Sequence, residues 1–407
     1  FEIIYMRNKR NALILGGVFT ASAASCCPCD AGEQNSSQYD VAAIVWPAYH
    51  PEPRWKELGI FPHGNGEWQN VYEAVSKKKG DNQPLVPLWG YEPEDNPIVV
   101  ARKIDAALAA GINVFMYDWY WYQGRPFLEG ALNNGFLKAP NNQRMKFFLM
   151  WANHVVDNLW NNKVGSPKDN KIIWSADVSF EEFTKVLVPR FIEYFKKPNY
   201  YKIDNKPLFA VFEFTNMIRG IGSAEKTLQA LDFLRAECKK AGFDGLHLMS
   251  MAWHGPAKGI VPGVEKPSST DIVKYYGFDS MSTYNMRGKR DNYEKWVDTS
   301  IAEWKQFKNE CGLFFPIVST GWDTNPRYPP DEFTPIVEGK SPVLYEKALR
   351  KAKAWADENI PADKPKLIII NAWNEWTEGE YLEPDKCYGY DYLNATARVF
   401  GAHGQSK

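Results

Sequence analysis

The chain is poor in cysteine and carries almost no excess charge. Only six of its 407 residues are cysteine, and three of these lie together at positions 26, 27 and 29. The others are scattered and odd in number, so they cannot form a full disulfide framework, and no Cys/His spacing matches a zinc site. The net charge is −1 and the basic residues do not cluster, so the sequence predicts no nucleic-acid partner. We expect no cofactor and no metal site, although scattered acids leave a divalent ion neither required nor excluded.

The N-terminal segment has the pattern of an export signal. Met6 reads as the true start, with residues 1–5 upstream of it. Basic residues at 7–10 precede a short apolar stretch at 12–25, which is typical of a secretory signal and too short to span a membrane as a mature helix. We therefore expect a signal peptide over residues 1–25 and export to the bacterial cell envelope.

The signal is followed by a candidate lipid attachment site. Cys26 comes directly after small residues, as the lipidated cysteine of a bacterial lipobox does. Ala23 stands where the lipobox usually has leucine, so plain export is the alternative. Residues 26–39 are polar and small and read as a tether. We expect contact with a membrane only through a lipid anchor on Cys26.

Beyond residue 39, apolar runs of strand length alternate with stretches of helical periodicity. The apolar runs are 41–46, 112–119, 145–151, 208–214, 246–253, 279–284, 313–320 and 367–373. Eight strands joined by helices pair in parallel through crossovers, and eight is the number that closes a (β/α)8 barrel. The sequence therefore predicts an α/β protein with a single (β/α)8 TIM barrel over residues 40–403 and long βα loops. The alternative, an open doubly wound sheet, lacks support because no strand leads into a Gly-rich dinucleotide loop.

Two glutamates follow the last apolar run. Glu375 and Glu378 lie three positions apart, beside Trp373 and Trp376. Two acids in one turn repel and raise each other's pKa, which is costly for a helix cap and useful for an acid/base pair. Paired carboxylates are the machinery of glycosidic-bond cleavage. We predict that both glutamates are catalytic.

The spacing of this pair bears on mechanism. Residues three apart lie roughly 5–6 Å from each other at Cβ in a helical turn and up to about 10 Å apart in an extended chain. Retaining enzymes hold their carboxyl groups about 5–5.5 Å apart, and inverting enzymes about 6.5–9.5 Å. The compact case favours retention, although the sequence does not determine which local turn the chain adopts.

Polar and aromatic residues also stand at the ends of the other predicted strands, which converge on one face of a barrel. Sugar hydroxyls need paired donors and acceptors, and sugar ring faces lie against aromatic rings. The alternatives are structural histidines and carboxylates and tryptophans that only build the wall. The predicted substrate-binding residues are Tyr49, His50, Asp118, Trp119, Trp121, Trp151, Asn153, His154, Glu213, Trp253, His254, Tyr284, Trp322 and Asn374.

These motifs resemble those of a known family. Residues 374–379, Asn-Glu-Trp-Thr-Glu-Gly, followed by Leu-Glu-Pro at 382–384, resemble the signature of glycoside hydrolase family 99, the endo-α-1,2-mannosidases and mannanases. The blocks at 47–51, 83–91, 117–122 and 150–154 are similar to those of the bacterial family 99-like proteins labelled WbsX. The resemblance covers residues 41–385, nearly the whole mature chain.

The resemblance implies a barrel that acts on α-linked sugars with retention. By position in the motif, it implies that Glu378 is the general acid/base and Glu375 the base that deprotonates the sugar 2-hydroxyl. The mannose-contacting residues of true family 99 members do not map onto this chain, so mannose specificity is not carried over. The WbsX label names a glycosyltransferase, but the sequence has no Asp-x-Asp-type nucleotide-sugar motif.

The sequence therefore predicts an exported glycoside hydrolase whose partner is a glycan or polysaccharide that contains α-linked sugars, with mannose as one candidate. Two alternatives stay open. The first is a non-catalytic surface barrel that binds glycans, and the second is a WbsX-type glycosyltransferase of polysaccharide biosynthesis. The sugar, the linkage and the oligomeric state are not fixed by the sequence.

Overall fold

The computed structural model describes residues 38–78, 81–157, 171–253 and 259–401. The predicted signal peptide, the lipidation site Cys26, most of the tether and His254 lie outside the described residues. Among the described helices, none combines the length and the apolar character needed to cross a membrane.

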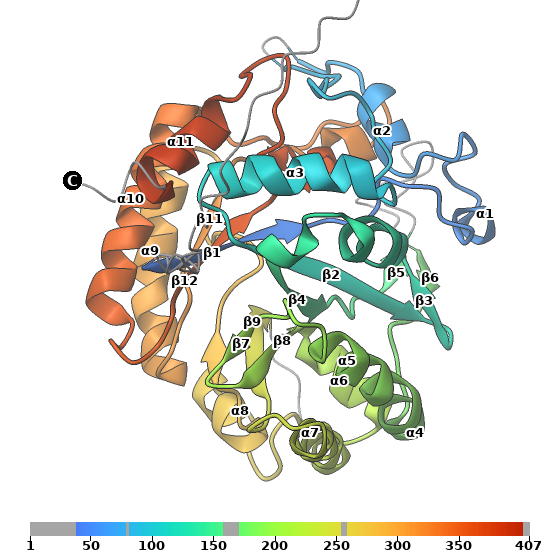
Figure 1. Ribbon diagram of the computed structural model, residues 1–407, viewed down its shortest axis with the longest axis vertical. Helices are drawn as coiled ribbons and strands as arrows, with labels where there is room; N and C mark the ends of the chain where they lie inside the picture. The colour runs from blue at the N-terminus through green and yellow to red at the C-terminus, as the bar shows by residue number, and fades with distance from the viewer. Residues whose placement is uncertain (1–37, 79–80, 158–170, 254–258, 402–407) are drawn as a thin grey trace, which may run out of the picture. The chain divides into compact units, whose positions relative to one another are not determined.

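Eight parallel strands follow one another in chain order around a barrel (Figure 1). Strand β1 pairs with β12, which joins the first strand of the barrel to the last. The remaining seam, between β10 and β11, is bridged at Met281 and Phe314, where Met281 N donates to Leu313 O at 2.9 Å and Phe315 N donates to Met281 O at 2.9 Å. The eight strands are β1 (Tyr39–Val45), β2 (Val114–Tyr122), β4 (Lys146–Trp151), β8 (Lys206–Glu213), β9 (His247–Trp253), β10 (Ser280–Met281), β11 (Ile317–Ser319) and β12 (Lys366–Asn371). The predicted (β/α)8 barrel is confirmed.

Helices surround the strands (Figure 1). Five helices, α3 and α7 to α10, begin with side-chain caps that satisfy free backbone N–H groups; the caps are Asn96, Ser223, Ser268, Asn292 and Ser341. The helices are α1 (Trp55–Leu58), α2 (Trp68–Tyr72), α3 (Pro97–Ala109), α4 (Phe180–Glu182), α5 (Val188–Phe195), α6 (Phe214–Ile221), α7 (Ala224–Lys240), α8 (Ser269–Tyr276), α9 (Tyr293–Cys311), α10 (Pro342–Asn359) and α11 (Asp391–Phe400).

Several short strands lie outside the eight strands of the barrel. Strand β3 (Arg125–Phe127) folds back on β2, and β7 (Lys202–Ile203) pairs with β8. Two separate hairpins form from β5 (Val156–Asp157) with β6 (Ile172–Trp174), and from β13 (Asn374–Glu375) with β14 (Glu380–Tyr381). The 3-10 and π-helical turns are η1 (Ala131–Gly135), η2 (Phe136–Lys138), η3 (Asn142–Arg144), η5 (Phe183–Leu187), η6 (Asn325–Arg327) and η7 (Trp376–Glu378).

The alternation of side chains along each strand decides which residues face the barrel interior. All nine residues of β2 are buried, because the barrel fills one face and helices cover the other. Asp118 and Tyr120 line an interior cavity, whereas Trp119 points the other way and packs against Phe191 of α5 at 5.0 Å. The same two-residue period holds at the end of β4, where Met150 and Ala152 line the cavity and Trp151 does not.

Candidate active site

A cavity of about 870 Å³ opens where the carboxyl ends of the strands converge. TIM-barrel enzymes keep their active sites on this face. The lining combines aromatic rings, carboxylates and three arginines. The lining residues are Trp46, Asp118, Tyr120, Met150, Ala152, His154, Phe212, Met251, Thr283, Tyr284, Asn285, Met286, Arg287, Gly288, Arg290, Glu303, Trp322, Arg327, Glu375 and Glu378.

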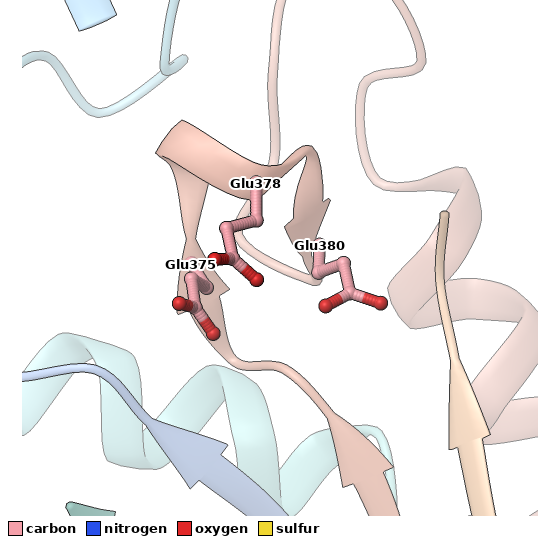
Figure 2. A group of neighbouring side chains, drawn as sticks. All are labelled: Glu375, Glu378 and Glu380. Carbon is pink, nitrogen blue, oxygen red and sulfur yellow. The ribbon is translucent and has the colours of Figure 1, made fainter. Parts of the chain in front are cut away.

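The two predicted catalytic glutamates come from a tight hairpin after β12. Glu375 ends β13, Glu378 ends the 3-10 turn η7, and Gly379 reverses the chain at a φ of 65°. Figure 2 shows the side chains of Glu375, Glu378 and Glu380 leaving this hairpin close together. One carboxylate oxygen of each lies within 4.8 Å of the others. This compact arrangement is close to the carboxyl separation of retaining glycosidases, about 5–5.5 Å.

A buried ion cluster anchors this hairpin to the barrel. Lys103 of α3 places its Nζ 2.7 Å from Glu94 Oε1 and 2.6 Å from Glu383 Oε1. Burial lowers the pKa of Lys103, but Glu383 and Glu94 outweigh it and raise the pKa above its ordinary value. Asn374 Nδ2 donates to Glu94 Oε1 at 2.7 Å and to Trp46 O at 2.8 Å. Asn374, predicted to bind substrate, therefore ties the hairpin to β1 and is fully buried.

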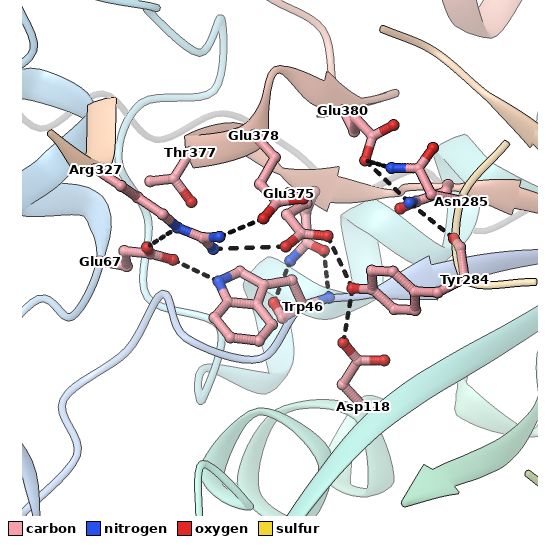
Figure 3. A network of polar contacts seen from close by, with 12 residues as sticks. Trp46, Glu67, Asp118, Tyr284, Asn285, Arg327, Glu375, Thr377, Glu378 and Glu380 are labelled. Carbon is pink, nitrogen blue, oxygen red and sulfur yellow. Dashed lines mark hydrogen bonds and ion pairs between the residues drawn. The ribbon is translucent and has the colours of Figure 1, made fainter. Parts of the chain in front are cut away.

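A single arginine contacts both of the predicted catalytic glutamates. Arg327 of η6 ion-pairs with Glu378 at short range, donates from Nη2 to Glu375 Oε1 at 3.5 Å, and donates from Nε to Glu67 Oε1 at 2.9 Å (Figure 3). Glu67 also accepts a hydrogen bond from Trp46 Nε1 at 2.5 Å. One positive charge thus pairs with three largely buried carboxylates. Because two negative charges remain unbalanced, the cluster favours a proton on one of its acids.

The hydroxyl of Tyr284 joins Glu375 to a third acid. It lies 2.8 Å from Glu375 Oε2 and 3.0 Å from Asp118 Oδ2 (Figure 3). A tyrosine hydroxyl has only one proton to donate, so both contacts are hydrogen bonds only when one of the two acids carries a proton.

The electrostatics of both acids favour that proton. Burial raises the pKa of Asp118 well above its ordinary value, with Tyr284 opposing and Glu378 adding to the rise. Burial also raises the pKa of Glu375, where the charge of Glu378 adds to the effect and Arg327 opposes it. Both shifts favour one shared proton on Asp118 or Glu375, which lets Tyr284 form a hydrogen bond with each of the two acids.

His154 supplies a neutral hydrogen-bonding group to the cavity wall. Its Nδ1 lies 2.9 Å from Val155 O, and because a carbonyl can only accept, Nδ1 carries the proton and Nε2 keeps its lone pair. Burial lowers the pKa of His154. Nε2 can thus accept a hydrogen bond from a donor group in the cavity.

The acidic trio of the hairpin also offers oxygen ligands of the kind that hard cations use. Glu375, Glu378 and Glu380 bring one oxygen each into mutual reach. The positive charge of Arg327, however, already lies against Glu375 and Glu378.

The structure brings six of the predicted site residues to the cavity and turns others away from it. Asp118, His154, Tyr284, Trp322, Glu375 and Glu378 line the cavity. The side chains of Trp119 and Trp121 lie on the outer face of β2, where their Nε1 atoms donate to Glu129 at 2.7 Å and to Glu182 at 2.6 Å. Trp151 has the same outward parity on β4 and packs against Phe183 at 5.8 Å.

The remaining predicted residues hold the rim together. Asn153 pairs with the backbone of Glu213 through two hydrogen bonds of 2.7 and 2.8 Å, while the Glu213 carboxylate caps α6 by accepting from Thr215 N at 3.1 Å. Tyr49 packs on Trp68 at 4.2 Å. His50 is buried beside Gly130, and burial lowers its pKa to about 4. The backbone of Trp253 ends β9; its side chain and His254 lie outside the described parts.

Fourteen of the twenty residues that line the cavity were not among the predicted ones, and three of them illustrate why. Tyr120 has the same strand parity as Asp118, and Trp46 follows the end of β1, so counting alternate positions would have found both. Arg327 lies in the long segment between β11 and α10. No motif marks it, because its role depends on how that loop folds over the hairpin.

A buried acid beside the pair gives a pH-dependent prediction. Glu380 accepts hydrogen bonds from Asn285 and Asn371 at 2.9 and 3.0 Å, and burial, followed by the charge of Glu378, raises its pKa well above 4.5. A raised pKa means that the folded state binds more protons than the unfolded state, so this group's contribution weakens as pH rises from 4.5 towards the folded pKa. We expect Glu380→Gln to raise the free energy of unfolding relative to wild type more at pH 8 than at pH 5.

Urea denaturation of both proteins at both pH values measures this difference. Gln keeps an oxygen that can accept hydrogen bonds from Asn285 and Asn371, so the substitution removes the titrating group and keeps these two contacts. An equal difference at pH 5 and pH 8 would show that Glu380 does not titrate with a raised pKa.

Comparison with known proteins places this barrel in a family. The sequence profile of the family described as "Glycosyltransferase WbsX" matches residues 41–396. Two proteins from strains of Xanthomonas campestris pv. campestris, both described as "Uncharacterized protein WxcX", are 24% identical over 381 residues. The match covers 88% of this chain and 49% of each relative, so the chain spans about half the length of the curated relatives it matches.

Solved structures with a similar fold are glycoside hydrolases or resemble them. A "glycoside hydrolase-like protein" superposes with a TM-score of 0.55 at 16% identity, covering 89% of this chain and 94% of the other. The GH99 endo-α-mannosidase from Bacteroides thetaiotaomicron superposes with a TM-score of 0.50 at 16% identity, covering 88% and 95%. At this identity the likeness shows the fold, and together with the family match it confirms the predicted resemblance to family 99-like proteins of the WbsX type.

Proposed function

The chain belongs to the family described as glycosyltransferase WbsX, and from that premise we propose that it is a retaining glycoside hydrolase of a glycan or polysaccharide. The observation that carries the proposal is the compact Glu375/Glu378 pair at the end of the last barrel strand. The pair faces a cavity of about 870 Å³ whose walls mix aromatic rings with hydrogen-bonding groups. Such a lining suits a sugar, whose faces are apolar and whose edges carry hydroxyls.

Each glutamate has a separate role in the proposed reaction. Glu378 donates a proton to the leaving glycosidic oxygen, while Glu375 takes the proton of the sugar 2-hydroxyl, whose oxygen then attacks the anomeric carbon and displaces the leaving group. Water next opens the resulting ring: Glu378 takes a proton from the water, and Glu375 returns its proton to the 2-oxygen. Two displacements at one carbon give net retention. The raised pKa of Glu375 makes its carboxylate a stronger base.

Tyr284 and Arg327 prepare the pair for this exchange. Tyr284 donates to Glu375 at 2.8 Å and lies 3.0 Å from Asp118, so it orients the base and links it to a proton reservoir. Arg327 contacts both catalytic carboxylates and offsets the negative charge that passes between them. The polar groups that the reaction needs are thus fixed by bonds to the barrel before a substrate enters.

The family description names glycosyl transfer, and the proposed chemistry is compatible with it in one respect. An acceptor hydroxyl that replaces water in the second step would yield a transfer product from the same intermediate. The pair of carboxylates nevertheless favours hydrolysis over a role as a binding module, because binding alone does not need two acids within 4.8 Å.

A glycan panel tests the proposal. Wild type, Glu375→Gln and Glu358→Gln are each incubated with the panel, with and without an added acceptor sugar, and new reducing ends and transfer products are measured. Glu358 is an exposed residue of α10 and serves as the matched control. We expect wild type and Glu358→Gln to release products and Glu375→Gln to release almost none.

Other results would point to the alternatives. Binding without release by wild type, retained when both glutamates are replaced, would indicate a binding barrel. Product that forms only when a nucleotide sugar is supplied would indicate a glycosyltransferase. Release by Glu375→Gln at the wild-type rate would contradict the proposed site.

A further inference from the structure

The loop after β10 brings an arginine without an anionic partner to the cavity. Arg290 lines the cavity, and its guanidinium lies 3.5 Å from the ring centroid of Trp322, which lines the same cavity. Within the described residues, no side chain forms a hydrogen bond or an ion pair with Arg290. The exposure of Arg290 is intermediate, so part of its guanidinium reaches the cavity space.

The acids around Arg290 have partners of their own. Asp291 pairs with Lys289 at 2.7 Å, and Glu303 pairs with Arg287 at 3.6 Å. Glu380 is held by the two asparagine amides, and Glu375 and Glu378 share Arg327. Each of these described acids has another partner, and none of them forms an ion pair with Arg290.

The contact with the Trp322 ring holds the guanidinium of Arg290 in place before a ligand binds. A guanidinium that lies on an aromatic face is attracted by the ring and keeps a fixed plane. Its N–H groups then point outward along the edge of that plane, in the fork that matches a carboxylate or another oxyanion. Little side-chain freedom remains to be lost when an anion binds.

We propose that Arg290, held on Trp322, binds an oxyanion substituent of the glycan, so that the substrate is an acidic glycan. The proposal rests on the proposed function, because it takes the cavity as a glycan site. The oxyanion can be the carboxylate of a uronic acid or a sulfate ester, since both match the guanidinium fork. Neighbouring Arg287 also lines the cavity, but its charge is balanced by Glu303, so Arg290 is the candidate anion site on this side.

A simpler role for Arg290 is to balance the charge of Glu380. Arg290 does oppose the rise in the pKa of Glu380, but the two form no ion pair among the described contacts. If balance were its whole role, removing Arg290 would change the stability of the protein or its pH profile. It would leave the discrimination between acidic and neutral glycans unchanged.

Affinity electrophoresis separates these roles. The Glu378→Gln protein, which does not consume the ligand, is run through gels that contain polygalacturonate, hyaluronate or chondroitin sulfate. Parallel gels contain carboxyl-reduced and desulfated forms of the same polymers. Added to this background, Arg290→Gln removes the charge, Arg290→Lys keeps the charge without the fork, and Lys289→Gln removes an exposed charge one position away.

We expect at least one acidic polymer to retard the protein and its neutralised form to lose the effect. Loss of retardation on carboxyl reduction identifies a carboxylate, and loss on desulfation identifies a sulfate. Arg290→Gln is expected to weaken binding about tenfold or more, as for a lost charge-assisted contact, Arg290→Lys to weaken it less, and Lys289→Gln to leave it within about twofold.

Three results would overturn the proposal: no retardation by any acidic polymer, equal retardation by the neutral forms, or equal effects of Arg290→Gln and Lys289→Gln. The test is independent of turnover. Selective binding with no hydrolysis by wild type would remove the proposed function and leave this proposal standing. Hydrolysis of a neutral glycan at the same rate by wild type and Arg290→Gln would support the proposed function and overturn the proposal for Arg290.

Discussion

Replacing Glu378 with glutamine is expected to lower glycan turnover by about 10²–10⁴-fold, the usual contribution of a positioned acid/base. The amide keeps the shape of the carboxylate and can still accept a bond from Arg327. It cannot give a proton to the leaving oxygen or take one from water. Release of reducing ends from a glycan that wild type cleaves measures the loss.

The matched controls make this result specific to catalysis. Glu358→Gln changes the same functional group on an exposed helix position and should turn over at the wild-type rate. The double variant Glu375→Gln/Glu378→Gln should be little slower than either single one, because residues that act as a unit are not additive. A folded Glu378→Gln protein with near wild-type turnover would remove Glu378 from the reaction.

The second large effect concerns stability and arises from the buried ion cluster of Lys103, Glu94 and Glu383. Lys103→Met is expected to lower the free energy of unfolding by about 3–5 kcal/mol, the cost of breaking a buried ion pair by removing one partner. The substitution leaves Glu94 and Glu383 buried without the Nζ that now lies 2.7 and 2.6 Å from them. Urea denaturation at neutral pH measures the change.

Two further variants sharpen this prediction. Lys347→Met, at an exposed position of α10, should change stability little. Adding Glu94→Gln and Glu383→Gln to Lys103→Met should recover part of the loss, because the uncompensated charges are then gone. A loss for Lys103→Met no larger than that for Lys347→Met would show that the cluster does not anchor the hairpin.

The barrel could be predicted from the sequence because its strands are buried on both faces. Each of the eight apolar runs overlaps a barrel strand, since such strands form continuous apolar segments in the sequence. The sixth strand is shorter than the predicted 279–284: β10 covers only Ser280–Met281, and Thr283, Tyr284 and Asn285 line the cavity instead. Helix α11 was not predicted from the sequence.

The closeness of Glu375 and Glu378 could be predicted for a different reason. Glu375 and Glu378 are close in the chain, so a single turn brings them together wherever the strand ends. Trp119, Trp121 and Trp151 were placed with the substrate because they stand at predicted strand ends, without regard to the alternation of side chains along the strand. The two-residue period of β2 and β4 turns all three towards the helices.

The rest of the site depends on contacts that are distant in the chain. Arg327 reaches Glu67, Glu375 and Glu378 from a loop, and Arg290 reaches Trp322 from another. Lys103 stands in an ordinary amphipathic helix pattern and becomes functional only because two acids from other segments meet it. The local sequence pattern carries no information on contacts between distant segments, so no spacing rule could have predicted them.

The configuration of the first product is the most direct test of the account. A glycan that wild type cleaves is followed by proton NMR from the start of the reaction, before the released sugar mutarotates. The compact Glu375/Glu378 pair predicts that the new reducing end first appears with the anomeric configuration of the bond that was cleaved. A first product of the opposite configuration would contradict the proposed mechanism.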